Sequence, residues 1–357
     1  MKVALIHDWL TGMRGGEKCL EVFCEMFPSA HLYTLMHVPG SVSKTIEQMD
    51  IRTSALQALP GSARHYRYYL PLLPAIVESW NTGGEAYDLV LSSCHCACKG
   101  AKFPSAKRRV CYCFTPMRYL WCQSENYYAG NWKQLALGAV RGPLKKWDLR
   151  SNRQVDEFIG ISDNVSDRIR RFYKRDAVTI YPPVDTEFYH PDNRKRGDFY
   201  LVAGALEPYK RADLAIEALR KWNRPLKIVG KGTMLESLRQ GAPPNVEFLG
   251  WRSDEEIRDL YRGARALIFP GEEDFGIVPL EAQACGCPVV AYGAGGILET
   301  VRDGETGIFF KEPTTESLIQ SLEQFEKMAW DPTRLRAQAE RFSRPRFRRE
   351  IEAYLKK

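Results

Sequence analysis

The chain has 357 residues, of which 44% are hydrophobic and 27% charged, and it carries a formal net charge of +7. A chain of this length is too long for a single typical hydrophobic core, so we expect two domains. The composition is that of a globular protein, which excludes the disordered and fibrous classes. No apolar run reaches the roughly 18 residues of a membrane span, and residues 1–8 turn polar too soon for a signal peptide, so we expect a cytoplasmic protein.

The positive charge is concentrated in the first half of the chain. Residues 1–184 contain 24 Lys and Arg against 16 Asp and Glu, whereas the remainder contains 27 against 28. A basic half predicts an anionic partner, either a phosphate-bearing acceptor or a membrane surface. The basic, aromatic segment 60–80 either rests on a lipid interface or packs into its own domain. Nucleic acid is not an expected partner, because the basic residues form no dense run and no nucleic-acid motif occurs.

The first half of the chain alternates predicted strands and helices. Residues 2–7 form a strand, and a loop with Gly15 and Gly16 precedes a helix over 17–27. A glycine pair before a helix is either a plain tight turn or an anion-binding loop. Residues 133–156 are helical and basic. Further strands are expected over 88–93, 109–114, 158–162 and 177–181.

Alternating cysteines lie in and after two of these strands. Cys94, Cys96 and Cys98 form one set, and Cys111 and Cys113 form the other. Zinc sites usually place two residues between paired cysteines, and that spacing is absent. We therefore predict buried free thiols rather than metal ligands or disulfides.

The second half repeats a strand–helix rhythm typical of a parallel, doubly wound sheet. The diproline in residues 182–185 stiffens the chain and is the predicted hinge. We therefore expect a first Rossmann-like domain over 1–184, a second over 185–340, and a helix over 341–357 that packs back on the first.

The most informative segment is residues 266–287, which read as a strand, an acidic loop and a helix. Glu273 lies in the loop and Glu281 near the first turn of the helix, with free N–H groups expected around Ile277 and Val278. Such a helix start favours a phosphate, and open parallel sheets bind ligands at the carboxyl ends of their strands. Judged locally, the two glutamates are either part of such a site or an acidic cap of the helix dipole.

Several motifs in this order resemble one enzyme family. The segments concerned are Gly15-Gly16-Glu17, Ile180 to Asp185, Leu206-Glu207-Pro208-Tyr209-Lys210, Glu273 to Ala282 and Gly286-Cys287-Pro288-Val289-Val290. Together they resemble the retaining GT-B glycosyltransferases with a Glu-x7-Glu motif (glycosyltransferase family 4, group 1), which include bacterial mannosyltransferases. The resemblance implies an α/β protein whose two doubly wound parallel sheets face a cleft, with the first domain binding the acceptor and the second the nucleotide sugar.

The implied reaction is metal-independent transfer of a hexose with retention of configuration. The resemblance favours mannose from GDP-mannose, with a UDP-sugar as the other candidate donor. It implies no cofactor besides the nucleotide sugar, and a glycan or polyprenyl-diphosphate-linked acceptor in polysaccharide biosynthesis, with peripheral membrane contact through the basic domain. Internal return and a covalent intermediate both remain open as mechanisms.

The same resemblance assigns roles to individual residues. Glu273 would bind the donor sugar near its anomeric carbon and Glu281 the ribose, while Lys210 and Arg211 would stabilise the leaving diphosphate. Glu273, Lys210 and Arg211 are the catalytic candidates. The donor-binding candidates are Gly15, Gly16, Lys210, Arg211, Glu273, Asp274, Phe275, Gly276, Ile277, Val278 and Glu281. The acceptor-side candidates are His95, Arg118 and Tyr119.

Two positions depart from the family pattern. Ala205 stands where an arginine is common, and Arg211 either compensates for it or points to solvent. Phe114 stands where many relatives have a histidine, and His95 either substitutes for that histidine or is structural. These departures keep two alternatives open: a sugar-nucleotide epimerase or phosphorylase on the same fold, and a non-catalytic nucleotide-sugar binder.

Overall fold

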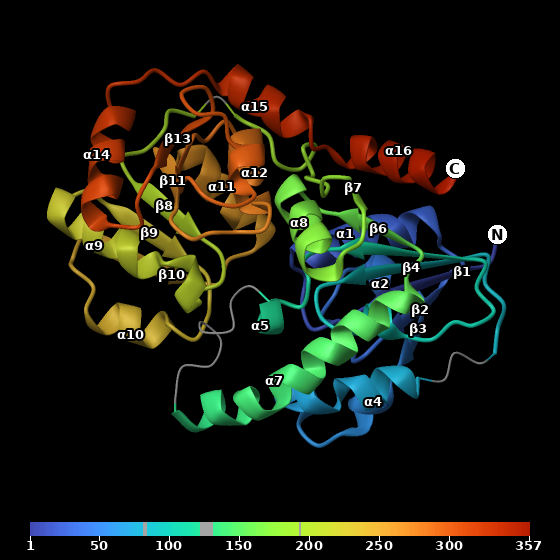
Figure 1. The fold of residues 1–357 in the computed structure, drawn as a ribbon. Coiled ribbons are helices and arrows are strands. Elements are labelled where there is room, and N and C mark those ends of the chain that lie inside the picture. Colours follow the sequence, from blue (N-terminus) through green and yellow to red (C-terminus); the bar gives the residue numbers. More distant parts are fainter. Residues whose placement is uncertain (81–83, 122–130, 193) are drawn as a thin grey trace. The chain divides into compact units, whose positions relative to one another are not determined.

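A computed structural model describes residues 1–80, 84–121, 131–192 and 194–357. The side chains of Arg64, Arg67, Tyr119 and residues 131–139 lie outside this description. The chain divides into two units (Figure 1), of which the first contains Met1–Tyr181 and Tyr354–Lys357 and the second contains Pro182–Ala353. The chain therefore passes from one unit to the other at the diproline.

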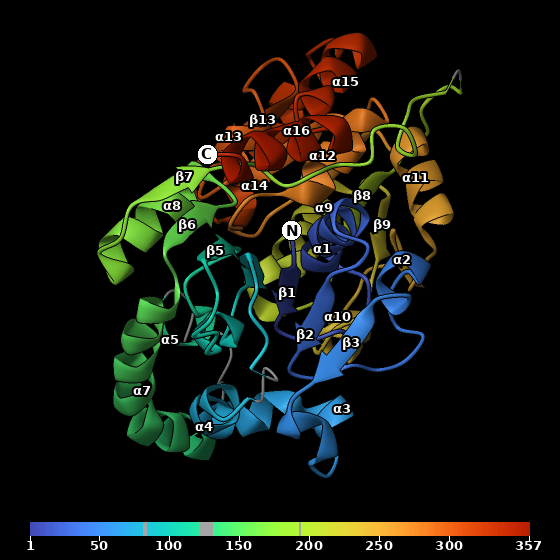
Figure 2. The same cartoon turned by 90° about the vertical axis from the view of Figure 1, so that its right-hand side faces the viewer.

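The first unit is built on a seven-stranded sheet in the order β3-β2-β1-β4-β5-β6-β7. Every neighbouring pair is parallel, and Figure 2 shows β3 at one edge beside β2. The strands are β1 (Val3–His7), β2 (His31–Thr34), β3 (Asp50–Thr53), β4 (Leu89–Cys94), β5 (Arg108–Cys113), β6 (Glu157–Gly160) and β7 (Ala177–Thr179). The helices are α1 (Gly15–Met26), α2 (Lys44–Glu47), α3 (Ser62–His65), α4 (Leu73–Glu78), α5 (Arg118–Trp121), α7 (Asn131–Ser151) and α8 (Asp163–Arg168).

The second unit is built on a six-stranded parallel sheet in the order β10-β9-β8-β11-β12-β13. The strands are β8 (Tyr200–Ala203), β9 (Leu226–Val229), β10 (Val246–Gly250), β11 (Ala266–Phe269), β12 (Val289–Tyr292) and β13 (Gly307–Phe310). The helices are α9 (Ala212–Trp222), α10 (Leu235–Gln240), α11 (Asp254–Gly263), α12 (Ile277–Ala284), α13 (Ile297–Thr300), α14 (Thr315–Phe325), α15 (Pro332–Glu340) and α16 (Arg344–Leu355). The end of α16 belongs to the first unit, where Arg108 donates to the carbonyl of Leu355 at 2.9 Å.

Both faces of the second sheet are covered, because successive side chains of a strand point to opposite faces. Tyr200 and Val202 of β8 belong to one buried cluster with residues of α9 and α14. Leu201, between them, belongs to a second cluster that includes residues of α11, α12 and α15. This is the two-sided burial of a doubly wound sheet, and it confirms the predicted fold class.

Some elements differ from the sequence prediction. Helix α1 begins at Gly15, two residues before the expected start, so the glycine pair forms its first turn. Strands β2, β3 and β13 had no predicted counterpart. Each has only four residues, and β3 lies at the sheet edge with no buried residue, so its hydrophobic pattern is weak.

The segment 60–80 contains α3, a 3₁₀ turn over Tyr66–Leu72 and α4 rather than one amphipathic helix. It buries Leu70 and Leu73 and exposes Tyr68 and Leu72. The packing role is therefore observed, and the exposed pair leaves the lipid-interface hypothesis standing. Within the described residues, no helix is long and apolar enough to cross a membrane.

The nine cysteines within the described residues are free and buried. Burial raises the pKa of the Cys94, Cys96 and Cys98 thiols well above the ordinary value. Because a thiol reacts as its thiolate, these groups should be inert at pH 8. In a Cys122→Ser variant, we expect no thiol to react with an aromatic disulfide reagent in the native state and nine to react in denaturant. Rapid native-state reaction of one or more thiols would contradict the packing described here.

Candidate functional site

In the second unit, two loops meet at the carboxyl ends of neighbouring strands β8 and β11. The first loop contains the 3₁₀ turn Pro208–Lys210, and the second contains Glu273. Parallel strands bring their carboxyl ends to the same sheet edge, which is where open α/β sheets bind ligands. The Lys210 ammonium and the Glu273 carboxylate form an ion pair there. The structure thus brings together two of the three predicted catalytic residues, across 63 positions of sequence.

Lys210 is held in a partly enclosed position. Its side chain is 23% exposed, and its Nζ lies 5.6 Å from the centre of the Phe269 ring and 5.5 Å from that of Tyr209. Gly271 allows the two loops to approach, because a Cβ at this position would lie 2.6 Å from the Tyr209 carbonyl oxygen. A larger residue at 271 would therefore displace the lysine loop.

Glu273 is positioned by the glycine run that follows β12. The Gly296 N–H donates to the Glu273 carbonyl at 2.8 Å. Gly295 has φ +75°, and a Cβ there would lie 2.5 Å from the same oxygen. The run therefore needs glycine both for conformation and for space. This run, residues 293–296, had no predicted role, although glycines directly after a predicted strand often mark a close approach of the backbone.

Helix α12 starts where the sequence predicts a phosphate-binding helix N-terminus. Gly276 precedes it with φ +103°, and Ile277 and Val278 are its first two residues. Asp274 and Phe275, just before it, are buried. The backbone N–H groups of a first turn have no partner within their own helix. The acidic loop and these N–H groups therefore lie within a few residues of each other.

Glu281 is the fifth residue of α12 and lies at the start of its second turn, next to the first turn near which the sequence pattern placed it. Its carboxylate is buried and accepts a hydrogen bond from the Tyr261 hydroxyl at 3.4 Å. Burial, with the nearby Glu281 charge, raises the pKa of Tyr261 well above its ordinary value, so this phenol stays a donor.

Arg211 does not join the Lys210–Glu273 pair. It adopts φ +54° just before α9, and its Nε lies 3.2 Å from Asp213 Oδ2. Its side chain is 39% exposed. Ala205, which stands where an arginine was expected, lines a small hollow with Lys210. In this structure, Lys210 alone of the two predicted cations contacts Glu273.

In the first unit, Gly15 and Gly16 begin α1 beside a buried carboxylate. The Arg14 N–H donates to Glu17 at 3.1 Å, and Glu17 lies 3.7 Å from His7 Nε2. Burial alone would raise the pKa of Glu17, but its interaction with the nearby His7 ring holds it below the ordinary value. A negative charge therefore already occupies this helix start.

His95 lies beside the carboxylate of Asp8, a residue that was not among the predicted site residues. Asp8 is fully buried and accepts four backbone N–H bonds, at 2.7–2.9 Å, from residues 95–98. His95 Nδ1 lies 3.3 Å from Asp8 Oδ2, and the His95 side chain is 30% exposed. Burial alone would raise the pKa of Asp8, but His95 and the N–H donors hold it low. The signal in the sequence was a carboxylate directly after the first strand.

The other acceptor-side candidates lie in α5. Arg118 is half-buried. The pKa of His95 is lowered mainly by the burial of its own ring, and the positive charge of Arg118 adds to this effect. The side chain of Tyr119 lies outside the described residues. Phe114 lies 6.3 Å from His95, ring centre to ring centre, so His95 lies beside the position where many relatives have a histidine. A neutral, partly exposed His95 oriented by Asp8 can accept a proton or a hydrogen bond.

Asp8, Cys94 and Cys98 also have potential ligand atoms within 4.8 Å of one another. These residues do not fit a metal site. Both carboxylate oxygens of Asp8 are taken by N–H donors, and burial raises the pKa of both thiols, so they remain protonated.

Part of the chain is similar in sequence to known proteins. Residues 185–342 match the family model "Glycosyl transferases group 1". A D-inositol 3-phosphate glycosyltransferase of Acidothermus cellulolyticus is 34% identical over 164 residues, which are 37% of each chain. An uncharacterized glycosyltransferase of Methanocaldococcus jannaschii is 28% identical over 47% of this chain and 48% of its own. The matched part spans about half the length of such curated relatives, or less.

Solved structures resemble the whole chain. HepE of Anabaena in complex with UDP-glucose has a TM-score of 0.75 at 20% identity, with 100% of both chains covered. Sucrose-phosphate synthase of Thermosynechococcus elongatus has a TM-score of 0.73 at 16% identity, with 100% and 98% covered. The fold is thus GT-B, with two Rossmann-like units, and residues 185–342 resemble the glycosyl transferases group 1 family in sequence.

Proposed function

We propose that this protein is a glycosyltransferase that transfers a hexose from a nucleotide sugar. The observation that carries the proposal is the pairing of Lys210 with Glu273 beside the start of α12. Breaking a sugar–diphosphate bond places negative charge on the leaving group and positive charge on the sugar. A cation and N–H dipoles stabilise the first, and a carboxylate can hold the sugar and stabilise the second.

The proposal assigns a task to each group. Lys210 and the N–H groups of Ile277 and Val278 bind the diphosphate, and Glu273 accepts hydrogen bonds from the sugar hydroxyls near the anomeric carbon. Glu281 binds the ribose. The transfer retains configuration and needs no metal. His95, oriented by Asp8, acts on the acceptor side.

The donor is a GDP- or UDP-hexose. The sequence resemblance favours GDP-mannose, whereas HepE was crystallised with UDP-glucose. For the acceptor we propose a glycan or a polyprenyl-diphosphate-linked sugar, reached by peripheral membrane contact of the basic first unit. Thermal-shift measurements with GDP-, UDP- and ADP-sugars should reveal one preferred nucleotide, because a ligand that binds only the folded state raises the melting temperature. A melting temperature unchanged by all three classes would overturn the proposal.

The ion pair also predicts how the site responds to a nucleoside diphosphate. In the free protein, the Glu273 carboxylate is paired with the Lys210 ammonium group, which a bound diphosphate would also contact. In a Glu273→Gln variant, we expect UDP or GDP to bind about 3- to 10-fold more tightly, because a competing charge-assisted contact worth about 1 kcal/mol is removed. Transfer by the same variant should fall. Calorimetry compares the diphosphate affinities of the variant and the wild type. Weaker binding by the variant would contradict competition between Glu273 and the diphosphate for Lys210.

One observation favours a second candidate, a non-catalytic nucleotide-sugar binder. Arg211 pairs with Asp213 and Ala205 carries no charge, so Lys210 has no cationic neighbour of the expected kind. Binding without hydrolysis or transfer over a broad acceptor panel would support this candidate. Product analysis separates the remaining enzyme classes, since an epimerase needs no acceptor and a phosphorylase needs inorganic phosphate.

A further inference from the structure

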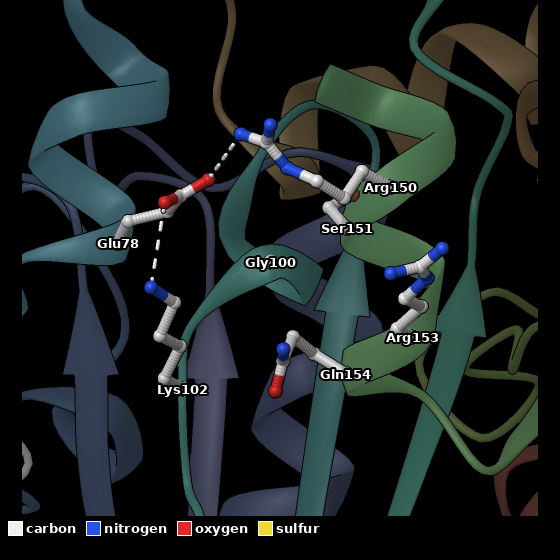
Figure 3. A pocket seen from close by; sticks show the side chains of 7 residues that line it. All are labelled: Glu78, Gly100, Lys102, Arg150, Ser151, Arg153 and Gln154. Atoms are coloured by element: carbon white, nitrogen blue, oxygen red, sulfur yellow. Dashed lines mark hydrogen bonds and ion pairs between the residues drawn. The ribbon is translucent and has the colours of Figure 1, made fainter. Parts of the chain in front are cut away.

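The first unit has a basic pocket formed by residues outside the proposed transfer site. It lies between the end of α4, the turn after β4 and the end of α7, and its volume is about 210 Å³. Figure 3 shows Glu78 and Lys102 on one side of Gly100 and Arg153 on the other. A Cβ at Gly100 would lie 3.0 Å from the Trp147 ring and 3.1 Å from Ser151 Cβ, so glycine lets the turn close against α7.

One carboxylate holds the pocket together. Glu78 Oε1 accepts the Trp147 indole N–H at 2.7 Å and an Arg150 N–H at 2.9 Å. Glu78 Oε2 accepts Lys102 Nζ at 3.3 Å. Burial alone would raise the pKa of Glu78, but these donors hold it below the ordinary value. Glu78 therefore holds two cationic side chains, those of Lys102 and Arg150, at the edge of the pocket.

The pocket keeps a surplus of donors. Three cationic side chains, Lys102, Arg150 and Arg153, line it against the single carboxylate of Glu78. Arg150 gives Glu78 one of its five N–H groups. Within the described part of the chain, the Arg153 guanidinium and the Gln154 amide make no hydrogen bond or ion pair. Such an excess of donors suits a ligand that offers acceptor oxygens and negative charge.

We propose that this pocket binds a phosphate group. A phosphate offers several charged acceptor oxygens, and arginine binds such groups in a bidentate way. The group comes from a soluble phosphate or from a lipid headgroup. Lys146 and Leu149 of α7 are exposed, one turn before Arg150 of α7 and Arg153 of the 3₁₀ turn Asn152–Gln154. The basic face therefore continues along the helix, with an apolar side chain on it.

The test compares the full-length protein with two charge-matched variants. Arg150→Gln/Arg153→Gln removes two pocket cations, whose side chains are exposed, so the fold should be kept. Lys44→Gln/Arg171→Gln removes two exposed cations elsewhere in the first unit. Inorganic phosphate is titrated by calorimetry, and binding to vesicles of phosphatidylglycerol and of phosphatidylcholine is measured by flotation. Phosphate bound at Lys210 is common to all three proteins and cancels in the comparison.

We expect the pocket variant to lose about 10-fold or more in affinity for phosphate, for phosphatidylglycerol vesicles, or for both, while the control variant matches wild type. Loss toward free phosphate alone identifies a soluble ligand, and loss toward anionic vesicles alone identifies a headgroup. Equal affinities of all three proteins for both probes would overturn the proposal. So would equal losses in both variants, which would indicate a general charge effect. Neither result bears on the transfer site of the second unit.

Discussion

Replacing Lys210 with alanine should lower the rate of sugar transfer by about 10²- to 10³-fold, because one donor aimed at developing charge contributes about 3–4 kcal/mol to the transition state. Lys210 pairs with Glu273 at the sheet edge and is only 23% exposed. Its charge therefore acts in a partly desolvated place, where electrostatic effects exceed those at the surface. The rate is measured as nucleoside diphosphate released from the preferred donor.

The matched control is Lys195→Ala, which removes an exposed lysine of the same unit. It should keep the wild-type rate. The Lys210→Ala protein should unfold at about the wild-type temperature, since its side chain lies at the edge of the core. A Lys210→Ala rate within threefold of wild type would remove Lys210 from the proposed chemistry.

Replacing Asp148 with alanine should cost about 3–5 kcal/mol of unfolding free energy, because it leaves the charge of Lys99 buried without its partner. Lys99 Nζ lies 2.8 Å from Asp148 Oδ1, and both side chains are at most 1% exposed. Asp148 also accepts the Trp121 indole N–H at 2.7 Å. The pair therefore ties the turn after β4 to α7 in the interior of the first unit.

Two further variants separate this effect from a general loss of charge. Asp156→Ala breaks the more exposed pair with Arg109 and should cost at most about 1 kcal/mol. The double variant Lys99→Met/Asp148→Leu removes both buried charges and should recover much of the stability lost in Asp148→Ala. Denaturant unfolding measures all three. An Asp148→Ala cost below that of Asp156→Ala would contradict the buried-pair description.

The architecture could be predicted because it depends on patterns that repeat along the chain. Apolar runs such as 266–269 alternate with helical segments, and this alternation fixes a parallel sheet whatever the details of each turn. Prediction failed for β2, β3 and β13, each only four residues long, and of these β3 and β13 lie at sheet edges. At an edge a strand is held by backbone pairing as much as by burial, so its side chains carry a weak signal.

The candidate site was predictable to the extent that it lies in continuous motifs. Glu273 and the start of α12 come from one segment, and Lys210 comes from a second that the sheet order brings beside it. Asp8 was missed because its role depends on the N–H groups of residues 95–98, which only the parallel pairing of β1 with β4 places nearby. The pairing of Arg211 with Asp213 likewise follows from the left-handed backbone at Arg211, which no residue pattern indicates.

The most direct measurement of the central claim is donor turnover by wild type and by a Glu273→Ala variant. Each purified protein is incubated with GDP-mannose and with UDP-hexoses, with and without a lipid-linked acceptor, and released nucleoside diphosphate and glycosylated product are quantified. The account predicts product from wild type with one nucleotide class, and a loss of about 10²-fold or more in the variant, whose melting temperature stays close to wild type. Full activity of Glu273→Ala would contradict the account.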